Sequence, residues 1–216
     1  MGNSCGTKGK IMPGQRYRLL YFNARGRAEL ARLILAATGV DYEDVRFEKE
    51  EWPKIKQTIH FEEVPILEVD GKQINQSYAI ARFLAREHGL YGKDAVEMAG
   101  VDAVVDTLED MMKPIYTIYL EENKEKMSSM LQKYKENTLK HYMQKFEEYL
   151  AKEDTEYFVG SSLTWADLHY INCMSWVTLF VPDALDNHPR LINLKNKIES
   201  LPRIANWLDT RPITNY

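Results

Sequence analysis

The sequence predicts a small α/β domain over residues 16–91, followed by an all-helical domain over residues 92–216. Two observations carry this prediction. In the first part, short runs of β-forming residues alternate with a helical period, and an Asp-Gly pair separates two apolar runs. In the second part the β-forming runs stop, and apolar residues recur at helical spacing. A chain of 216 residues can bury one sizeable core or two smaller ones.

The first three elements are a strand, a helix and a second strand. Residues 18–22 are mostly β-formers, and Gly26 helps to end this run. From Ala28 onward the apolar residues fall on one helical face, until Gly39 closes the helix. Residues 42–47 then form the second strand. This order implies a parallel pair of strands joined by a crossover helix.

A hairpin and a helix complete the α/β domain. After an irregular stretch around residues 52–53, two apolar runs at 65–69 and 72–74 flank Asp70-Gly71, a strong signal for a hairpin turn. We expect Ser77 to cap a helix that ends at Gly89. The complete order of elements is that of a thioredoxin-like domain.

The helical domain is predicted from its apolar stripes. One stripe runs from Val101 to Ile115, and another from Leu139 to Leu150. Residues 164–167 (Thr-Trp-Ala-Asp) resemble a capping box at the start of a very apolar helix through Val181. Two short helices, over 191–201 and 204–208, end the chain.

Composition excludes several classes of function. The net charge of −4 offers no basic stripe for nucleic acid. No run approaches the roughly 18 apolar residues that a membrane span needs. Two cysteines, Cys5 and Cys173, cannot build a disulfide framework, and this favours a reducing compartment. Residues 1–15 are small and polar, with no secretory pattern, and we interpret them as a flexible tail. We therefore expect a cytoplasmic protein.

The end of the first strand is the reactive position of a thioredoxin-like domain, and Tyr21 occupies it. Arg27 follows at the start of the next helix. A hydroxyl donor and a nearby cation would favour the thiolate form of a thiol substrate, and the thiolate is the nucleophile. Taken alone, a strand tyrosine packed in the core is the simpler interpretation of Tyr21.

Three further positions suit a peptide-like ligand. A helix N-terminus at Gln76-Ser77 can bind a carboxylate through its N–H groups. A cis peptide at Val64-Pro65 would turn the backbone of Val64 outward, to pair with an extended peptide. Trp52 and Lys56 could hold a second carboxylate with an indole N–H and an ammonium group. For each position, simple capping or surface packing is the alternative.

The order of these motifs resembles that of a sigma-class glutathione transferase, a class that includes prostaglandin D synthase-type and invertebrate members. The segments that carry the resemblance begin at Tyr21, Trp52, Val64, Gln76 and Leu163. It extends from about Tyr17 to the Arg211-Pro212 end. It implies a thioredoxin-like glutathione-binding domain and a helical domain that carries the co-substrate site and the contacts of a homodimer.

The resemblance also implies roles for individual residues. Tyr21 would hydrogen-bond the sulfur of glutathione, with support from Arg27, and Phe22 and Tyr116 would line the site of the hydrophobic electrophile. The residues implied in glutathione binding are Tyr21, Arg27, Trp52, Lys56, Glu63, Val64, Gln76, Ser77 and, from the partner subunit of a homodimer, Asp110. We expect the wall of the electrophile site to include Phe22, Tyr116 and the C-terminal segment near Ile213.

The sequence departs from the family pattern in two places. Two carboxylates, Glu62 and Glu63, precede Val64 and would repel anionic glutathione, so a side-chain contact from Glu63 is weakened whereas a backbone contact at Val64 is not. Residues 113–117 contain no tryptophan, although prostaglandin D isomerases of this class stack one there. This second departure argues against prostaglandin isomerisation.

Three carboxylates, Asp106, Glu109 and Asp110, are spaced to share one helical face. In some sigma-class relatives this face binds a divalent metal, and oxygen ligands would suit Mg²⁺ or Ca²⁺. A solvated acidic face is the favoured interpretation, so we assign no metal site. We expect Cys173 and His169, on the apolar helix, to be buried structural residues.

The leading function is glutathione conjugation to electrophilic small molecules, with peroxide reduction or isomerisation as further uses of the same thiolate. The alternative is a non-enzymatic carrier of apolar ligands, or a lens crystallin-type structural protein on the same fold. A thiol–disulfide oxidoreductase would need a cysteine near Tyr21, and the sequence has none there.

Overall fold

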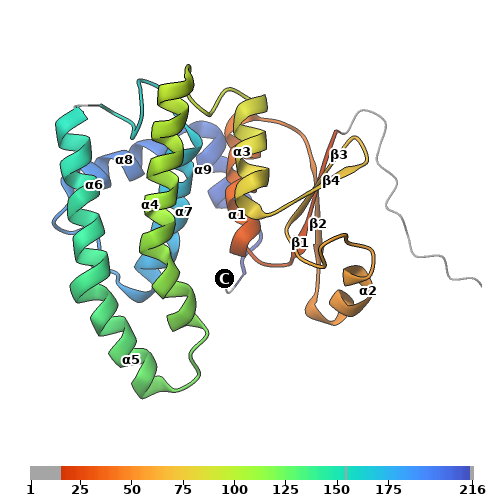
Figure 1. Cartoon of the computed structure of the whole chain (residues 1–216), viewed down its shortest axis with the longest axis horizontal. Helices are drawn as coiled ribbons and strands as arrows, with labels where there is room; N and C mark the ends of the chain where they lie inside the picture. The colour runs from red at the N-terminus through yellow and green to blue at the C-terminus, as the bar shows by residue number, and fades with distance from the viewer. Residues whose placement is uncertain (1–15, 154, 215–216) are drawn as a thin grey trace, which may run out of the picture.

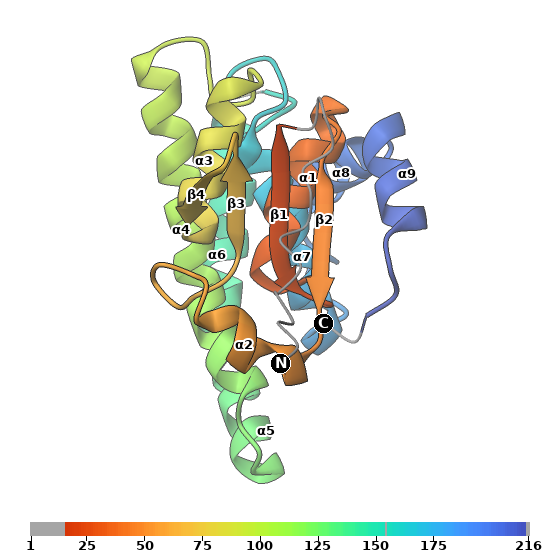
Figure 2. The same ribbon diagram turned by 90° about the vertical axis from the view of Figure 1, so that its right-hand side faces the viewer.

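The computed structural model describes residues 16–153 and 155–214. The expected tail over residues 1–15, with Cys5, lies outside them. The first part forms one four-stranded sheet in the order β2-β1-β3-β4 (Figure 2). Strands β1 and β2 are parallel and β3 and β4 are antiparallel, as the β-α-β and hairpin patterns predict. Strand β3 also pairs antiparallel with β1. The strands are β1 (Tyr17–Phe22), β2 (Glu43–Phe47), β3 (Ile66–Val69) and β4 (Lys72–Asn75).

The helices of the first part follow the sequence prediction with two corrections. Helix α1 (Glu29–Thr38) follows a 3₁₀ turn, η1 (Gly26–Ala28), and ends at Gly39, which adopts the left-handed conformation. Helix α3 (Ser77–Glu87) begins one residue earlier than expected, so Ser77 is its first residue and not its cap. The capping position belongs to Gln76, whose φ of 71° is left-handed and whose side chain makes no capping bond.

The second correction concerns the stretch expected to be irregular. It forms a 3₁₀ turn, η2 (Lys49–Glu51), and a short helix, α2 (Trp52–Lys56). A capping box between Glu48 and Glu51 starts this segment. Pro53 lies in the first turn of α2, where the backbone N–H that proline lacks would have no partner within the helix.

The second part is entirely helical in the described residues. Thr164 and Asp167 form the predicted capping box at the start of α7. No helix there is long and apolar enough to cross a membrane. A π-helical segment, η3, which the sequence pattern did not predict, joins α5 to α6. The helices are α4 (Ala95–Tyr119), α5 (Lys124–Lys133), η3 (Tyr134–Leu139), α6 (Lys140–Glu153), α7 (Trp165–Phe180), α8 (Pro189–Glu199) and α9 (Pro202–Thr210).

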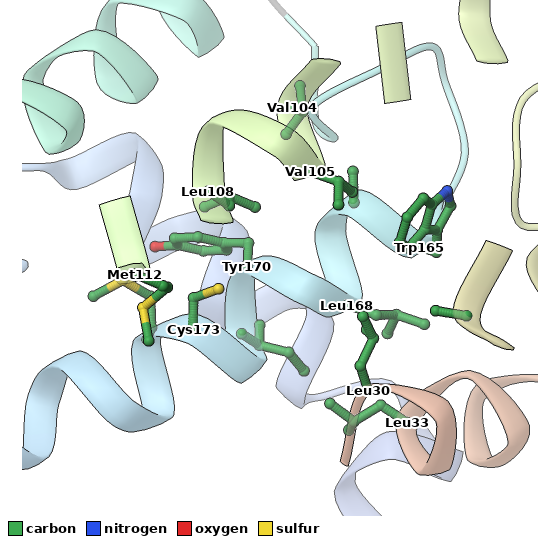
Figure 3. Packing of buried hydrophobic residues seen from close by; sticks show 14 of the residues in the cluster. Leu30, Leu33, Val104, Val105, Leu108, Met112, Trp165, Leu168, Tyr170 and Cys173 are labelled. Carbon is green, nitrogen blue, oxygen red and sulfur yellow. The ribbon is translucent and has the colours of Figure 1, made fainter. Parts of the chain in front are cut away.

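The two parts share one hydrophobic core. Helices α1 and α3 lie between the sheet and the helical layer of α4 and α7 (Figure 1). Figure 3 shows Leu30 and Leu33 of α1 beside Leu168 of α7, and all three are buried in the same cluster. Because the core is continuous, side chains at this joint are held by packing from both sides. The domain boundary between residues 91 and 92 stays a prediction.

The end of the chain is bound to the first helix. Glu29, at the start of α1, is buried and accepts hydrogen bonds from Trp207 Nε1 at 3.0 Å and Arg211 NH1 at 2.7 Å. Charge-assisted bonds of this kind are stronger than neutral ones. They connect α9, and the residue that follows it, to the helix next to the Tyr21 loop.

Candidate functional site

Tyr21 lies at the end of β1, and its hydroxyl is held by the loop that follows. The backbone N–H of Arg27 donates to the Tyr21 hydroxyl oxygen at 3.1 Å. Because that oxygen acts as the acceptor, the hydroxyl hydrogen remains available for donation to a bound sulfur. Gly26 has a φ of +40°, and a Cβ atom there would lie 2.6 Å from the Tyr21 hydroxyl. The close approach of loop and hydroxyl therefore requires glycine.

A buried arginine beneath the loop fixes its course. Arg32 of α1 is fully buried and donates to the carbonyl of Ala24 at 2.7 Å and to that of Arg25 at 3.3 Å. Its Nε bonds Asp44 of β2 at 3.1 Å, and its guanidinium lies 6.0 Å from the centre of the Tyr21 ring. These contacts satisfy a charge that burial would otherwise make costly, and they hold the loop in one position.

A first cavity of 310 Å³, the polar cleft, opens beside this loop. It collects six residues expected to bind glutathione, from four separate segments. The Val64–Pro65 peptide is cis, as the sequence suggested. Lys56, expected to hold the glycyl end of glutathione, is not among the lining residues. The polar cleft is lined by Phe22, Arg27, Trp52, Glu62, Glu63, Val64, Pro65, Gln76 and Ser77.

The two carboxylates before Val64 are both engaged within the chain. Glu62 pairs with Lys56 at 3.0 Å, and Glu63 accepts a bond from the Gln76 side chain at 2.8 Å. The ion pair offsets part of the repulsion expected between Glu62 and an anionic peptide. The amide of Gln76 is turned towards Glu63, so this side chain must reorient to donate to a ligand in the polar cleft.

A second cavity of 380 Å³, the apolar pocket, is lined by Tyr21. Both residues expected to contact the electrophile, Phe22 and Tyr116, line it. Ile213 is fully exposed and is not among the lining residues, and its place in the wall stays a prediction. The full lining consists of Tyr21, Phe22, Ala24, Gly26, Arg27, Leu30, Lys49, Ser77, Tyr78, Glu109, Tyr116, Tyr119, Leu120, His169, Asn172 and Trp176.

The apolar pocket changes character from its mouth to its inner end. Leu120 and Tyr119, 75% and 41% exposed, mark the mouth, and His169, 2% exposed, marks the inner end. The sequence patterns did not assign Tyr78, Glu109, His169 or Trp176 to a co-substrate site. Their spacing within α3, α4 and α7 indicated only helical faces.

Four polar side chains meet at the inner end. Tyr78 donates a short hydrogen bond to Glu109 Oε2 and lies 3.3 Å from His169 Nε2, and the hydroxyl of Tyr116 lies 3.5 Å from the same Glu109 oxygen. Burial raises the pKa values of Tyr78 and Tyr116 far above the ordinary range. Burial also lowers the pKa of His169 to about 3. The two tyrosines are therefore neutral donors near neutral pH, and the histidine is uncharged.

The expected structural roles of His169 and Cys173 agree with their surroundings. Cys173 Sγ lies 3.5 Å from His169 Nε2, and Figure 3 shows this thiol among Leu108, Met112 and Tyr170. Burial raises the pKa of Cys173 well above its ordinary value, so the thiol is unreactive.

The three carboxylates of α4 do not converge. Asp106 and Asp110 are exposed, and Asp110 pairs with Lys113 at 2.6 Å, whereas Glu109 is turned into the apolar pocket. Residues 16–153 and 155–214 contain no group of three or more side chains arranged to hold a metal ion. Asp110 lies outside both cavities, and its action from a partner subunit stays a prediction.

The two cavities share three of their lining residues, and Tyr21 lines the apolar pocket. Phe22, Arg27 and Ser77 line both of them. An extended thiol peptide in the polar cleft would therefore meet an apolar molecule in the apolar pocket at the Tyr21 hydroxyl. Such a geometry suits thiolate transfer to an apolar electrophile.

Comparison with known proteins agrees with this geometry. Residues 18–86 match the model of the glutathione S-transferase N-terminal domain, and residues 109–211 match that of the C-terminal domain. Haematopoietic prostaglandin D synthase of Homo sapiens is 44% identical over 92% of this chain and 98% of its own length. Glutathione S-transferase 1 of Ascaris suum is 39% identical over 93% of this chain and 99% of its own.

A solved structure gives the same result in three dimensions. Rat prostaglandin D synthase complexed with a quinoline superposes with a TM-score of 0.85 at 41% identity, over 93% of this chain and 99% of that one. From these matches, the chain belongs to the glutathione S-transferase family, and its likeness to the haematopoietic prostaglandin D synthases fits the sigma class.

Proposed function

We propose that Tyr21 stabilises the thiolate of glutathione in this chain and that the thiolate then attacks hydrophobic electrophiles in the apolar pocket. Glutathione would lie in the polar cleft, with its cysteinyl backbone at Val64 and its γ-glutamyl end at Gln76-Ser77. Trp52 and Lys56 would face the glycyl end, with Glu63 beside the peptide. The sulfur would then point at Tyr21, between the two cavities.

The observation that carries this proposal is the hydrogen bond from the Arg27 backbone to the Tyr21 hydroxyl, 3.1 Å long. It orients the hydroxyl before any ligand arrives and makes its hydrogen a donor. A preorganised donor stabilises negative charge on sulfur without further rearrangement. The side chain of Arg27, exposed beside both cavities, adds positive charge to the same place.

The proposal is tested by conjugation of glutathione to 1-chloro-2,4-dinitrobenzene. We expect Tyr21→Phe to lower turnover by roughly 10²-fold, the scale of losing one preorganised donor. Glutathione affinity, measured by calorimetry, should persist, because the polar cleft is unchanged. The matched control is Tyr142→Phe, which removes the hydroxyl of a residue that lines neither cavity. Unchanged turnover in Tyr21→Phe would refute the assignment.

A different outcome of the same experiment would favour a non-enzymatic function. Tight glutathione binding without turnover on any electrophile would favour a ligand carrier or a crystallin-type structural protein.

The second candidate activity is prostaglandin isomerisation, because the human, chicken and rat relatives at 44%, 44% and 41% identity are named prostaglandin D synthases. Residues 113–117 lack the expected tryptophan, yet Trp176 of α7 places an indole in the same pocket. Product analysis with prostaglandin H₂ decides this point.

We also infer a cytoplasmic homodimer. The carboxylate of Asp110 is exposed, and by the family resemblance it would meet the γ-glutamyl amino group in a neighbouring subunit. Sedimentation at micromolar concentration tests the dimer, and the test is needed because a similar structure from Necator americanus is described as monomeric. Cell fractionation tests the location. A divalent cation near Asp106 and Asp110 is not favoured, and titration with Mg²⁺ would detect it.

A further inference from the structure

Glu109 places a carboxylate at the inner end of a pocket that is otherwise largely apolar. It is partly buried, and it is the acidic residue among those that line this pocket in the described part of the chain. Both of its hydrogen-bond partners in the described residues, Tyr78 and Tyr116, lie at the same oxygen, Oε2. Oε1 makes no hydrogen bond or ion pair with residues 16–153 or 155–214.

A carboxylate against apolar walls is stable only when donors satisfy it. Tyr78 supplies one short bond, but the bond from Tyr116 is 3.5 Å long, at the outer limit for such an interaction. The remaining oxygen can therefore accept from a ligand. The cations that line the pocket are Arg27 and Lys49, and the Arg27 guanidinium lies over the Tyr116 ring at 5.9 Å.

The position of Glu109 relative to the reaction centre follows from consecutive contacts. The backbone of Arg27 bonds the Tyr21 hydroxyl, the Arg27 side chain lies over Tyr116, and the Tyr116 hydroxyl faces Glu109. Tyr21 and Glu109 line the same pocket, so one ligand bound there can contact both residues.

We propose that Glu109 determines co-substrate specificity. It accepts a hydrogen bond from a hydroxyl group next to the reacting carbon of an apolar electrophile, and it disfavours electrophiles that carry a carboxylate. This inference rests on the proposed function of the site. The substrate class that fits is the γ-hydroxyalkenals, with the hydroxyl at Glu109 and the alkyl chain directed to Trp176 and Leu120.

The reaction with this class balances without a further reactant. The thiolate sulfur forms a bond to the β-carbon, and the carbon–carbon π pair moves towards the carbonyl to give an enolate. The enolate then takes up one proton at the α-carbon, equal to the proton that the thiol lost. The hydroxyl at Glu109 is unchanged and serves only to position the chain.

The test compares two substrates that differ only in the hydroxyl, 4-hydroxynon-2-enal and non-2-enal. In the wild type we expect kcat/KM to favour the hydroxylated substrate by about tenfold, the worth of one buried hydrogen bond. Glu109→Leu should abolish the preference, whereas Glu109→Gln, which keeps an acceptor oxygen, should retain most of it. Asp106→Asn removes a charge one turn away on the exposed face and should retain the full preference. An unchanged preference in Glu109→Leu would overturn the inference.

A binding measurement tests the same inference without catalysis. Calorimetry of decanol and decanoate, with glutathione present, should show weaker binding of decanoate to the wild type. Glu109→Gln should tighten decanoate binding about tenfold, because it removes like-charge repulsion inside a pocket of low polarity. Equal binding of decanoate to both proteins would overturn the inference. If the protein conjugated no electrophile but still bound decanoate more weakly than decanol, the proposed function alone would be refuted.

Discussion

The polar cleft and the apolar pocket share Phe22, Arg27 and Ser77, but they are constructed differently. The polar cleft is lined within residues 22–77, by loops and element ends of the α/β part. The apolar pocket draws its inner lining from α3, α4 and α7, which are far apart in the chain. A site made of short motifs in one domain leaves a recognisable order in the sequence. A site made where three helices meet depends on packing, and its chemistry becomes visible only when the helices are placed.

The largest expected effect comes from weakening the anchor of α7. This helix contributes residues to the apolar pocket and none to the polar cleft. Asp167 is buried and accepts from the N–H groups of Phe158 and Thr164, at 2.9 and 2.7 Å, and from the Thr164 hydroxyl. Asp167→Ala leaves these donors unpaired, so we expect a loss of about 3 kcal/mol in unfolding free energy. Urea denaturation measures it. A loss below about 1 kcal/mol would show that α7 is anchored mainly by its apolar packing.

The next effect is a dependence of stability on pH that arises from His169, at the inner end of the apolar pocket. The pKa of His169, lowered by burial to about 3, is about 6.5 in the unfolded chain. As pH falls below 6.5 the unfolded chain gains a proton that the folded protein does not, so stability is lost. From pH 7 to pH 5 this amounts to roughly 2 kcal/mol.

The matched variant is His169→Phe, which cannot gain that proton. Between pH 7 and pH 5 the unfolding free energy of the wild type should fall by roughly 2 kcal/mol more than that of the variant. Denaturant titrations at the two pH values give this difference. A difference that does not change with pH would mean that His169 is accessible to protons in the folded protein.

A smaller effect is expected at the point where the two cavities meet. In Gly26→Ala, the new Cβ would collide with the Tyr21 hydroxyl at 2.6 Å. We expect conjugation to fall about tenfold, because small displacements of a catalytic group are costly. Gly71→Ala is the control, since Gly71 also has a positive φ but has no atom within 4 Å of the added Cβ. Equal losses of activity in both variants would attribute the effect to backbone strain and not to the collision.

The smallest effect separates the two cavities by two substitutions of one kind. Trp176 lines only the apolar pocket, and Trp52 lines only the polar cleft. Trp176→Leu should raise the KM for the electrophile about fivefold and leave that for glutathione unchanged, and Trp52→Leu should do the reverse. Steady-state kinetics with each substrate varied in turn measures both. If either variant raised both constants equally, the cavities would not bind their ligands independently.

The fold was predictable because local signals agreed with one another. The strand alternation, the Asp70-Gly71 turn and the Thr164–Asp167 capping box each led to the element that the structure contains. The errors occurred where local rules overlap. Ser77 is a good capping residue, yet the turn after β4 places Gln76 in the capping position. The helix α2 was missed because five residues are too few to establish a period.

The candidate site was predictable to different degrees in its two halves. Tyr21, Val64 and Gln76-Ser77 lie in motifs whose order carries the family resemblance, and their binding roles stay predictions. Glu109 was considered only as part of an acidic face, because spacing along α4 cannot show which side meets α3 and α7. Its contact with Tyr78 joins residues 31 positions apart and needs the packed helices to exist.

The bond between Arg211 and Glu29 has a consequence for the synthesis of the chain. The two residues are 182 positions apart, and Trp207 reaches the same carboxylate across 178. On the ribosome, α1 and the Tyr21 loop emerge long before Trp207 and Arg211, which both donate to Glu29 Oε1. Until translation is nearly complete, Glu29 has its ion pair with Arg32 of the same helix, at 3.6 Å, but lacks these two donors. A message truncated before Arg211 would yield a chain that contains every residue of the polar cleft and still lacks the partner that completes its first helix.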